Sequence, residues 1–284
     1  MAKMLYITTY LPKWFSTDLI KNVLTIAGSD PSGGAGIQAD LKSFSANGVY
    51  GMSVITALTA QNTKGVSNIH SLPKDFILDQ LNSIFNDIKV DAVKIGMIAN
   101  SHISETVANF LNKKNVVNIV LDPVMVAKGG AKLLDNNAIS SIKSNLMPIS
   151  TIVTPNLPEA SMLSESKEAS SKDEMIIQGK ALLNNGSYSI YIKGGHLKGT
   201  FSPDLLVGKQ NLLWLESKRI KTKNTHGTGC TLSSAIAANL SKGFDIGKAV
   251  KDAKNYVHGA IKYADTLDVG SGNGPTHHFH AIWK

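Results

Sequence analysis

The sequence predicts an α/β fold with a mostly parallel central sheet and helices on both faces, a three-layer αβα arrangement. Short apolar runs rich in β-branched residues alternate along the chain with segments of helical periodicity. Several runs end in glycine or in a polar side chain, as parallel strands do when their carboxyl ends open onto a ligand crevice. No linker rich in proline or serine and no internal repeat divides the 284 residues, so one domain is favoured over two.

The first elements form half of a nucleotide-binding unit. The apolar run 23–28 is expected to be a buried strand, and the glycine-rich turn 29–36 follows it directly. Apolar residues then recur at helical spacing until Gly48 ends the helix. A second strand is expected over residues 50–60, which leaves Gln61 at its carboxyl end.

The alternation continues through the middle of the chain. The periodicity predicts helices over 77–88, 103–111 and 173–184, and strands over 91–96, 118–121, 150–154 and 188–193. Ser101 is expected to cap the helix that starts at Ile103. The rhythm breaks at 204–215, where two short apolar segments flank a turn as in an antiparallel hairpin. A last amphipathic helix is expected over 246–261.

Composition narrows the class of protein. With 43% hydrophobic and 18% charged residues the chain is an ordinary globular protein, and no run of 18 apolar residues predicts a membrane span. The formal net charge of +8 favours anionic partners such as nucleotides. The basic residues are scattered, with Arg219 as the single arginine, which argues against a nucleic-acid surface. The single cysteine, Cys230, fits a reducing compartment, so we expect the protein in the cytoplasm.

The loop Asn224–Cys230 is the strongest local signal. Its glycines lead into an apolar, alanine-rich helix, and a helix start presents backbone N–H groups to a phosphate. Cys230 lies on the first turn of that helix. A helix N-terminus lowers the pKa of a thiol, so we expect this sulfur to ionise near neutral pH and to act as a base or nucleophile. The alternative is a small residue packed in a tight joint.

Polar and glycine residues gather where the predicted strands end. A lysine, an anion-binding helix start, carboxylates able to hold Mg²⁺ and a carboxamide are the parts needed for phosphoryl transfer from a nucleotide. The residues concerned are Gly28, Gln61, Gly96, Met97, Asp122, Asn156, Glu159, Lys193 and Gly227 to Cys230. Neither a Gly-x-x-x-x-Gly-Lys-Ser/Thr phosphate loop nor a Gly-x-Gly-x-x-Gly fingerprint after the first strand is present, so another kinase architecture is required.

Ordered motifs along the chain resemble one known family. They are AGSDPSGGAGIQAD at 27–40, AQNT at 60–63, KIGM at 94–97, DPVM at 122–125, TPNLPE at 154–159, KGGH at 193–196 and THGTGC at 225–230. Together they resemble hydroxymethylpyrimidine/phosphomethylpyrimidine kinase of thiamine biosynthesis, a branch of the ribokinase-like superfamily. The resemblance implies a ribokinase-like kinase domain over 23–284 that uses ATP and Mg²⁺ and forms a homodimer. Residues 1–22 fall outside it and are expected to be an accessory N-terminal extension.

The resemblance also implies which residues bind the substrate. Gln61 would hydrogen-bond the aminopyrimidine, whose ring nitrogen and amino group match the donor and acceptor of a carboxamide. Gly28 and Asp40 would border the hydroxymethyl end, and Met97 would contact the ring. For Asp40 the alternative is a satisfied helix carboxylate, and for Met97 it is a place in the core.

The phosphate side is implied in the same way. Asn156 and Glu159 would organise Mg²⁺ and phosphate, with Asp122 in support, although each could instead cap a helix or turn. Lys193 would neutralise the β- and γ-phosphates. The residues expected to form the anion hole around the transferred phosphoryl group are Gly227, Thr228, Gly229 and Cys230. Cys230 would also take the hydroxyl proton, a hypothesis because little deprotonation is needed in a loose transition state.

The expected function is ATP-dependent phosphorylation of 4-amino-5-hydroxymethyl-2-methylpyrimidine and then of its monophosphate. A pyridoxal kinase of the same branch is the closest alternative, since pyridoxal also has a hydroxymethyl group. Gln61 favours the aminopyrimidine. A non-catalytic binding protein is a remote alternative, because Lys193, Glu159, Gly227, Gly229 and Cys230 are all in place.

Overall fold

The computed structural model describes residues 19–125, 136–184 and 186–283. Most of the predicted N-terminal extension, residues 1–18, therefore lies outside the described residues, and its role stays a prediction. Among the described residues no helix is long and apolar enough to cross a membrane.

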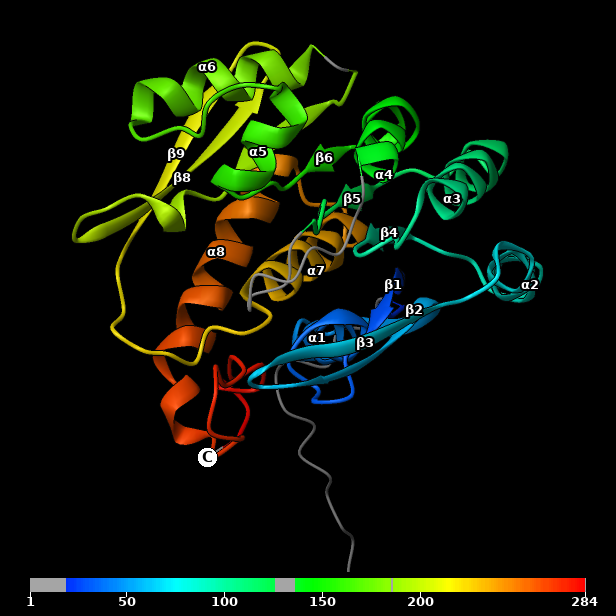
Figure 1. Cartoon of the computed structure of the whole chain (residues 1–284), viewed down its shortest axis with the longest axis horizontal. Coiled ribbons are helices and arrows are strands. Elements are labelled where there is room, and N and C mark those ends of the chain that lie inside the picture. The colour runs from blue at the N-terminus through cyan, green and yellow to red at the C-terminus, as the bar shows by residue number, and fades with distance from the viewer. Residues whose placement is uncertain (1–18, 126–135, 185, 284) are drawn as a thin grey trace, which may run out of the picture.

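A single mixed sheet organises the fold, with nine strands among the described residues in the order β3-β2-β1-β4-β5-β6-β7-β8-β9 (Figure 1). The strands from β2 through β1 and β4 to β7 run parallel, whereas β3 and the β8–β9 hairpin are antiparallel additions at the two edges. The bounds are β1 Asn22–Ser29, β2 Tyr50–Asn62, β3 Gly65–Ser71, β4 Ala92–Ile95, β5 Ile119–Leu121, β6 Ile152–Val153, β7 Ser189–Ile192, β8 Phe201–Gly208 and β9 Leu212–Lys218.

Helices cover both faces of the sheet, which confirms the three-layer prediction (Figure 1). The helices are α1 Gly36–Ala46, α2 Lys74–Phe85, α3 Ser101–Lys113, α4 Asn136–Ser141, α5 Leu157–Ser164, α6 Lys172–Leu183, α7 Thr228–Ser241 and α8 Ile246–Lys262. Side chains of α2 to α6 pack in one apolar cluster, and those of α1, α7 and α8 pack in a second. Alternate strand residues enter opposite clusters, for example Leu24 in the first and Val23 in the second.

Helix α7 lies at the centre of its layer. It contacts α1, α8, β1, β4 and β5, and the stretch from Thr231 to Ser241 is buried throughout. Its small alanine and serine side chains allow close approach to the sheet, and a helix that is buried on all sides needs no polar face. This position places its N-terminus, with Gly227 as the N-cap, at the carboxyl ends of the parallel strands.

Several elements differ from the sequence prediction. Strand β2 continues through Gln61 and Asn62, because it pairs with an antiparallel strand, β3, that the sequence did not suggest. Most β3 residues are exposed or half-buried, so an apolar run is missing there. Helices α4 and α5 were also not predicted. The predicted cap Ser101 is wrong by one residue, since the Asn100 side chain accepts the Ile103 N–H.

Candidate active site

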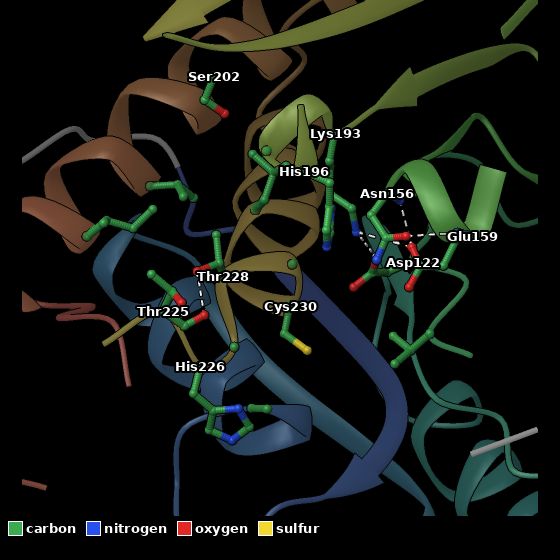
Figure 2. Close-up of a pocket in the computed structure, with 18 of the residues that line it drawn as sticks. Asp122, Asn156, Glu159, Lys193, His196, Ser202, Thr225, His226, Thr228 and Cys230 are labelled. Carbon is green, nitrogen blue, oxygen red and sulfur yellow. Dashed lines mark hydrogen bonds and ion pairs between the residues drawn. The ribbon is translucent and has the colours of Figure 1, made fainter. Parts of the chain in front are cut away.

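A cavity of about 1210 Å³ lies at the carboxyl ends of the parallel strands (Figure 2). Its walls come from the turn after β1, the end of β2, the ends of β5 and β7, and the N-terminus of α7. Parallel strands of an open sheet deliver their last residues to one such crevice. The predicted site residues that line it are Gly28, Gln61, Met97, Asp122, Asn156, Glu159, Lys193, Gly227, Thr228, Gly229 and Cys230.

The loop before α7 is held by contacts from two distant segments. Gly227 has φ of 75°, and a Cβ there would lie 1.8 Å from the Gly34 carbonyl oxygen. The His226 N–H donates to the Gly274 carbonyl, and His226 pairs with Pro275 in an isolated bridge. Glycine is therefore required at 227 both for its backbone angle and for space. The first turn of α7, from Thr228 to Cys230, lines the cavity, so this helix start offers an anion-binding element there.

Lys193 is the centre of a charge cluster next to the start of α7 (Figure 2). Its Nζ lies 2.8 Å from an Asp122 oxygen and 3.6 Å from Glu159 Oε2. Burial lowers the pKa of Lys193, but the charges of Asp122 and Glu159 outweigh it, and the net pKa is raised. A Cβ on Gly229 would lie 3.2 Å from this Nζ, so the ammonium group sits beside the helix start. Two positive elements thus face the same space.

Asn156 and Glu159 cap helix α5. The Asn156 side chain accepts the Glu159 N–H at 2.8 Å, and Glu159 Oε2 accepts the Asn156 N–H at 2.7 Å, which is a reciprocal capping box. The helix-capping role that the sequence allowed for this pair is therefore present. It does not exclude a role in the site, because both residues also line the cavity and Glu159 lies beside Lys193.

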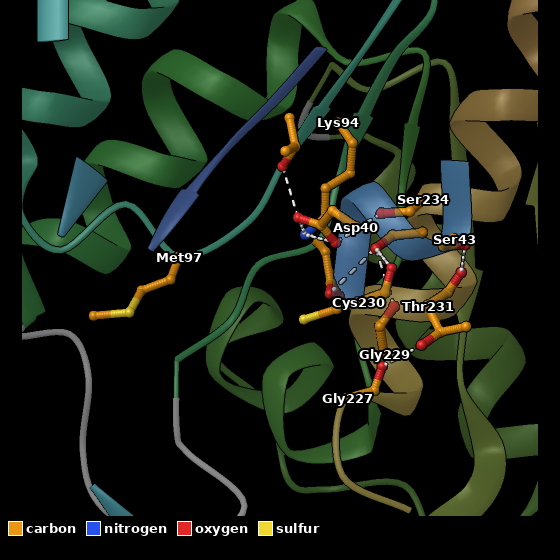
Figure 3. A network of polar contacts seen from close by, with 12 residues as sticks. Asp40, Ser43, Lys94, Met97, Gly227, Gly229, Cys230, Thr231 and Ser234 are labelled. Atoms are coloured by element: carbon orange, nitrogen blue, oxygen red, sulfur yellow. Dashed lines mark hydrogen bonds and ion pairs between the residues drawn. The ribbon is translucent and has the colours of Figure 1, made fainter. Parts of the chain in front are cut away.

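The predicted low pKa of Cys230 is wrong. Burial raises the pKa of the thiol to about 11, Lys94 lowers it, and the carboxylates of Asp40 and Asp122 raise it. The helix N-terminus is a partial charge, whereas desolvation and two nearby carboxylates oppose the thiolate. The sulfur lies on the first turn of α7, in the cavity wall (Figure 3). With a pKa of about 11 it is a neutral thiol at pH 7.

Asp40 lies beneath the cavity and is not among the residues that line it. Its fully buried carboxylate accepts hydrogen bonds from Lys94 at 2.8 and 2.9 Å, from Thr25 at 2.6 Å and from Ser234 at 2.7 Å (Figure 3). Lys94, which lines the cavity, is also fully buried, and both of its pairing distances are those of a tight ion pair. The structure thus places Lys94 at the wall where the sequence predicted Asp40.

Gly28 and Met97 lie side by side in the cavity wall. A Cβ on Gly28 would lie 3.1 Å from the Met97 sulfur. Met97 is 9% exposed and its carbonyl accepts a hydrogen bond from Thr56. The absence of a side chain at Gly28 therefore leaves room for Met97 to form part of the cavity wall.

Gln61 belongs to a polar group that the sequence did not reveal. Its Nε2 is 3.3 Å from His226 Nε2, and the same ring nitrogen is 2.8 Å from an Asp30 carboxylate oxygen. The Thr59 hydroxyl lies 3.1 Å from Gln61 Oε1. All of these side chains line the cavity. Asp30 and His226 each stand inside a motif quoted above, which is the only sequence signal for them.

A sequence model of a family described as phosphomethylpyrimidine kinase matches residues 30–277. The chain belongs to the phosphomethylpyrimidine kinase family. A hydroxymethylpyrimidine/phosphomethylpyrimidine kinase of Salmonella typhimurium is 51% identical over 262 residues, which cover 92% of this chain and 98% of that protein. The family and the sequence resemblance therefore agree.

Solved structures of two kinds resemble this family member. A phosphomethylpyrimidine kinase from Clostridium difficile is 45% identical, has a TM-score of 0.76 and is matched over 85% of this chain and 100% of its own. A pyridoxal kinase from Staphylococcus aureus in complex with AMP-PCP and pyridoxal is 33% identical, with a TM-score of 0.86 over 93% of this chain and 96% of its own. The ribokinase-like fold expected from the sequence is confirmed.

The carboxylates of this kinase family member suit a shared magnesium site. Among the described residues no group of three or more His, Cys, Asp and Glu side chains could hold a metal ion alone. Asp122 and Glu159 nevertheless flank Lys193 on the cavity wall. Mg²⁺ in kinases keeps several waters and takes one or two carboxylates together with substrate phosphates. The two side chains fit that donor set, in which phosphates and waters would supply the remaining ligands.

Alkylation of Cys230 is expected to be slow at neutral pH and to accelerate about tenfold per pH unit between pH 7 and 10, because only the thiolate reacts. The single cysteine makes the measurement unambiguous, with iodoacetamide incorporation followed by mass spectrometry. Free N-acetylcysteine is the reference and should reach its plateau at lower pH. A fast, pH-independent reaction at pH 7 would contradict the neutral thiol.

Replacing Glu159 with glutamine is expected to flatten the pH dependence of stability in magnesium-free buffer. Burial raises the pKa of Glu159 to about 7, Lys193 lowers it and Asp122 raises it. The folded state then holds a proton that the unfolded state releases near pH 4.5. The stability from this proton is present below that pH and is lost as the pH rises through 7, by about 1–3 kcal/mol.

Urea unfolding at pH 5 and pH 8 measures this effect. The unfolding free energy of the glutamine variant, measured relative to the wild type, should be higher at pH 8 than at pH 5. The glutamine keeps a side-chain oxygen that can cap α5. Glu168→Gln, at an exposed position, is the control and should show no such gain. If the difference in unfolding free energy between the wild type and Glu159→Gln were the same at pH 5 and pH 8, the raised pKa would be contradicted.

Proposed function

We propose that this protein transfers the γ-phosphoryl group of ATP to 4-amino-5-hydroxymethyl-2-methylpyrimidine, and then phosphorylates the monophosphate to the diphosphate used in thiamine diphosphate biosynthesis. Family membership supports the reaction class. The observation that carries the proposal is one cavity onto which Lys193, the Gly227 loop and the Gln61 carboxamide all open. A cation, an anion-binding helix start and a base-pairing edge are what the two substrates require.

Lys193 and the start of α7 act on the phosphates. The ammonium group lies beside Gly229, where it would balance the charge on the β- and γ-phosphoryl oxygens. The N–H groups at Gly229 and Cys230 would receive the transferred group. Magnesium, when bound, would supply positive charge that offsets the negative charge of the phosphates. Asp122 and Glu159 would hold that ion and keep Lys193 oriented.

Cys230 positions the substrate hydroxyl in this proposal. A thiol with a pKa of about 11 is protonated at pH 7 and is not a base in the resting protein. In a loose transition state the attacking hydroxyl loses little of its proton before transfer, so alignment matters more than basicity. Cys230 would therefore contribute a weak hydrogen bond and a fitted surface.

An ATP-consumption assay with the pyrimidine alcohol and its monophosphate tests the proposal, with magnesium present and pyridoxal assayed in parallel. Turnover of both pyrimidines with a higher kcat/KM than pyridoxal is expected. The pyridoxal alternative has its own support, because a solved pyridoxal kinase overlays this chain with a TM-score of 0.86. A clear preference for pyridoxal would replace the pyrimidine assignment. If neither the pyrimidines nor pyridoxal caused ATP consumption, both assignments would be rejected.

We also propose a homodimer in the cytoplasm. An edge strand, β3, and exposed apolar side chains on the neighbouring β2, such as Tyr50 and Leu58, would suit contact with a second copy. The single cysteine suits a reducing compartment. Light scattering after size exclusion should give about twice the chain mass of 30.3 kDa, and a monomer mass would remove the dimer.

A further inference from the structure

The Gln61 carboxamide lies between two polar neighbours in the cavity wall. One end of the amide is 3.1 Å from the Thr59 hydroxyl oxygen and the other is 3.3 Å from His226 Nε2. The oxygen and nitrogen ends of a carboxamide have the same shape, so hydrogen-bond partners decide which end lies where. Each neighbour has a third partner that fixes its own role.

His226 Nε2 must be a hydrogen-bond donor. It lies 2.8 Å from an Asp30 carboxylate oxygen. Burial raises the pKa of Asp30, but the hydrogen bonds from His226 and Ser32 outweigh it, so the pKa stays below its usual range and the group is an anion at neutral pH. A carboxylate only accepts, so the shared proton is on the ring nitrogen. The Gln61 atom facing this N–H must therefore be an acceptor, the carbonyl oxygen.

The Thr59 hydroxyl leads to the same answer from the other side. It has one proton, which it donates to the Ser29 carbonyl at 2.8 Å. The hydroxyl can then only accept from Gln61. Its partner in the carboxamide must be the –NH₂ group. With the amide nitrogen toward Thr59 and the carbonyl toward His226, the Thr59 hydroxyl accepts from Gln61, and the single Nε2 proton of His226 is shared between Asp30 at 2.8 Å and the Gln61 carbonyl at 3.3 Å. The opposite orientation sets donor against donor at His226.

We propose that Thr59 and His226 are specificity-determining positioning residues, which hold the Gln61 carboxamide with its oxygen toward His226 and its nitrogen toward Thr59. The orientation leaves the second amide N–H and one carbonyl lone pair to face a ligand in the cavity. A ligand edge with an exocyclic donor on the His226 side and a ring acceptor on the Thr59 side fits this pattern.

The consequence for the substrate rests on the proposed function. A 4-aminopyrimidine presents an amino donor beside a ring-nitrogen acceptor and matches the fixed amide. The 4-oxo analogue of the same alcohol presents a carbonyl acceptor beside a ring N–H and would need the reversed amide. A site that holds a carboxamide in one orientation rejects the reversed pattern, because buried polar groups would be left unpaired.

The kinetic test compares kcat/KM for the aminopyrimidine alcohol with kcat/KM for its 4-oxo analogue. Thr59→Val and His226→Leu should each lower this preference at least fivefold, mainly through KM of the aminopyrimidine. Thr59→Ser keeps the hydroxyl and His226→Gln keeps a donor near the Nε2 position, so both should retain the wild-type ratio. Ser67→Ala is the control, since the Ser67 hydroxyl donates to the Ala60 carbonyl on the same hairpin and Ser67 does not line the cavity. An unchanged ratio in both Thr59→Val and His226→Leu would overturn the proposal.

Neutron diffraction from the deuterium-exchanged, ligand-free protein tests the orientation without any assay. The two amide deuterons of Gln61 are expected at the Thr59 end, and a deuteron is expected between His226 Nε2 and Asp30. Deuterons of Gln61 at the His226 end would overturn the proposal. Failure of the wild type to phosphorylate either pyrimidine would reject the proposed function alone, and the neutron result would then decide the orientation.

Discussion

Replacing Lys193 with methionine is expected to lower kcat/KM by about 100- to 1,000-fold, the range found when one fixed group that stabilises transition-state charge is removed. Two effects add. The phosphates lose their nearest fixed cation. Asp122 and Glu159 also lose the ammonium group that lies between them, 2.8 Å from the Asp122 oxygen and 3.6 Å from the Glu159 oxygen. Steady-state kinetics with the pyrimidine alcohol and ATP, at saturating magnesium, measure the loss.

Lys248→Met is the matched control for Lys193→Met. Lys248 forms an exposed ion pair with Asp252 on α8 and does not line the cavity. Surface pairs of this kind contribute at most about 1 kcal/mol, and we expect activity within twofold of the wild type. If Lys193→Met kept activity within fivefold while circular dichroism showed a folded protein, Lys193 would lose its role in charge stabilisation.

Replacing Gly227 with alanine is expected to destabilise the protein by about 3 kcal/mol or more and to lower kcat/KM at least 100-fold. The left-handed φ of 75° alone disfavours a Cβ by about 1–2 kcal/mol. The Cβ would also overlap the Gly34 carbonyl at 1.8 Å, so the loop must move away from the turn after β1. Urea unfolding and kinetics on the same preparation measure both effects.

Gly243→Ala separates the two causes. Gly243 follows α7 with φ of +83°, and a Cβ there would meet nothing within 4 Å. Only the backbone penalty applies, so we expect about 1–2 kcal/mol of destabilisation and unchanged kcat/KM. Equal losses of stability in the two variants would show that the overlap with Gly34 is relieved at little cost.

The central strands were predictable because they are buried on both faces. All residues of 92–95 and 119–121 are buried, and all but Lys94 are apolar, so these runs leave a clear pattern in the sequence. The convergence of Asp122, Glu159 and Lys193 followed from topology alone, since parallel strands end at one edge. Strand β3 was missed because it lies exposed at the edge of the sheet and consists mostly of polar residues, so it has no apolar run to mark it in the sequence.

The electrostatics of the site could not be predicted from local sequence. The pKa of Cys230 depends on Asp40 and Asp122, which other elements bring to the start of α7. The resemblance placed Asp40 in the cavity wall. In the structure Asp40 is not part of that wall, because it is held in the core by its ion pair with Lys94, 54 residues away in the sequence. The contact between Asp30 and His226 spans 196 residues. No periodicity or local motif encodes pairings of that kind.

The bridge between His226 and Pro275 affects when the site can form during synthesis of the chain. Every residue assigned to phosphoryl transfer has left the ribosome once Cys230 is clear of the exit tunnel, but the backbone partners of His226 at Gly274 and Pro275 are made more than 40 residues later. A chain stopped after Thr266 is therefore expected to hold the full set of phosphate-binding side chains and to consume little ATP. The phosphate-binding loop would be among the last parts of the nascent protein to become ordered.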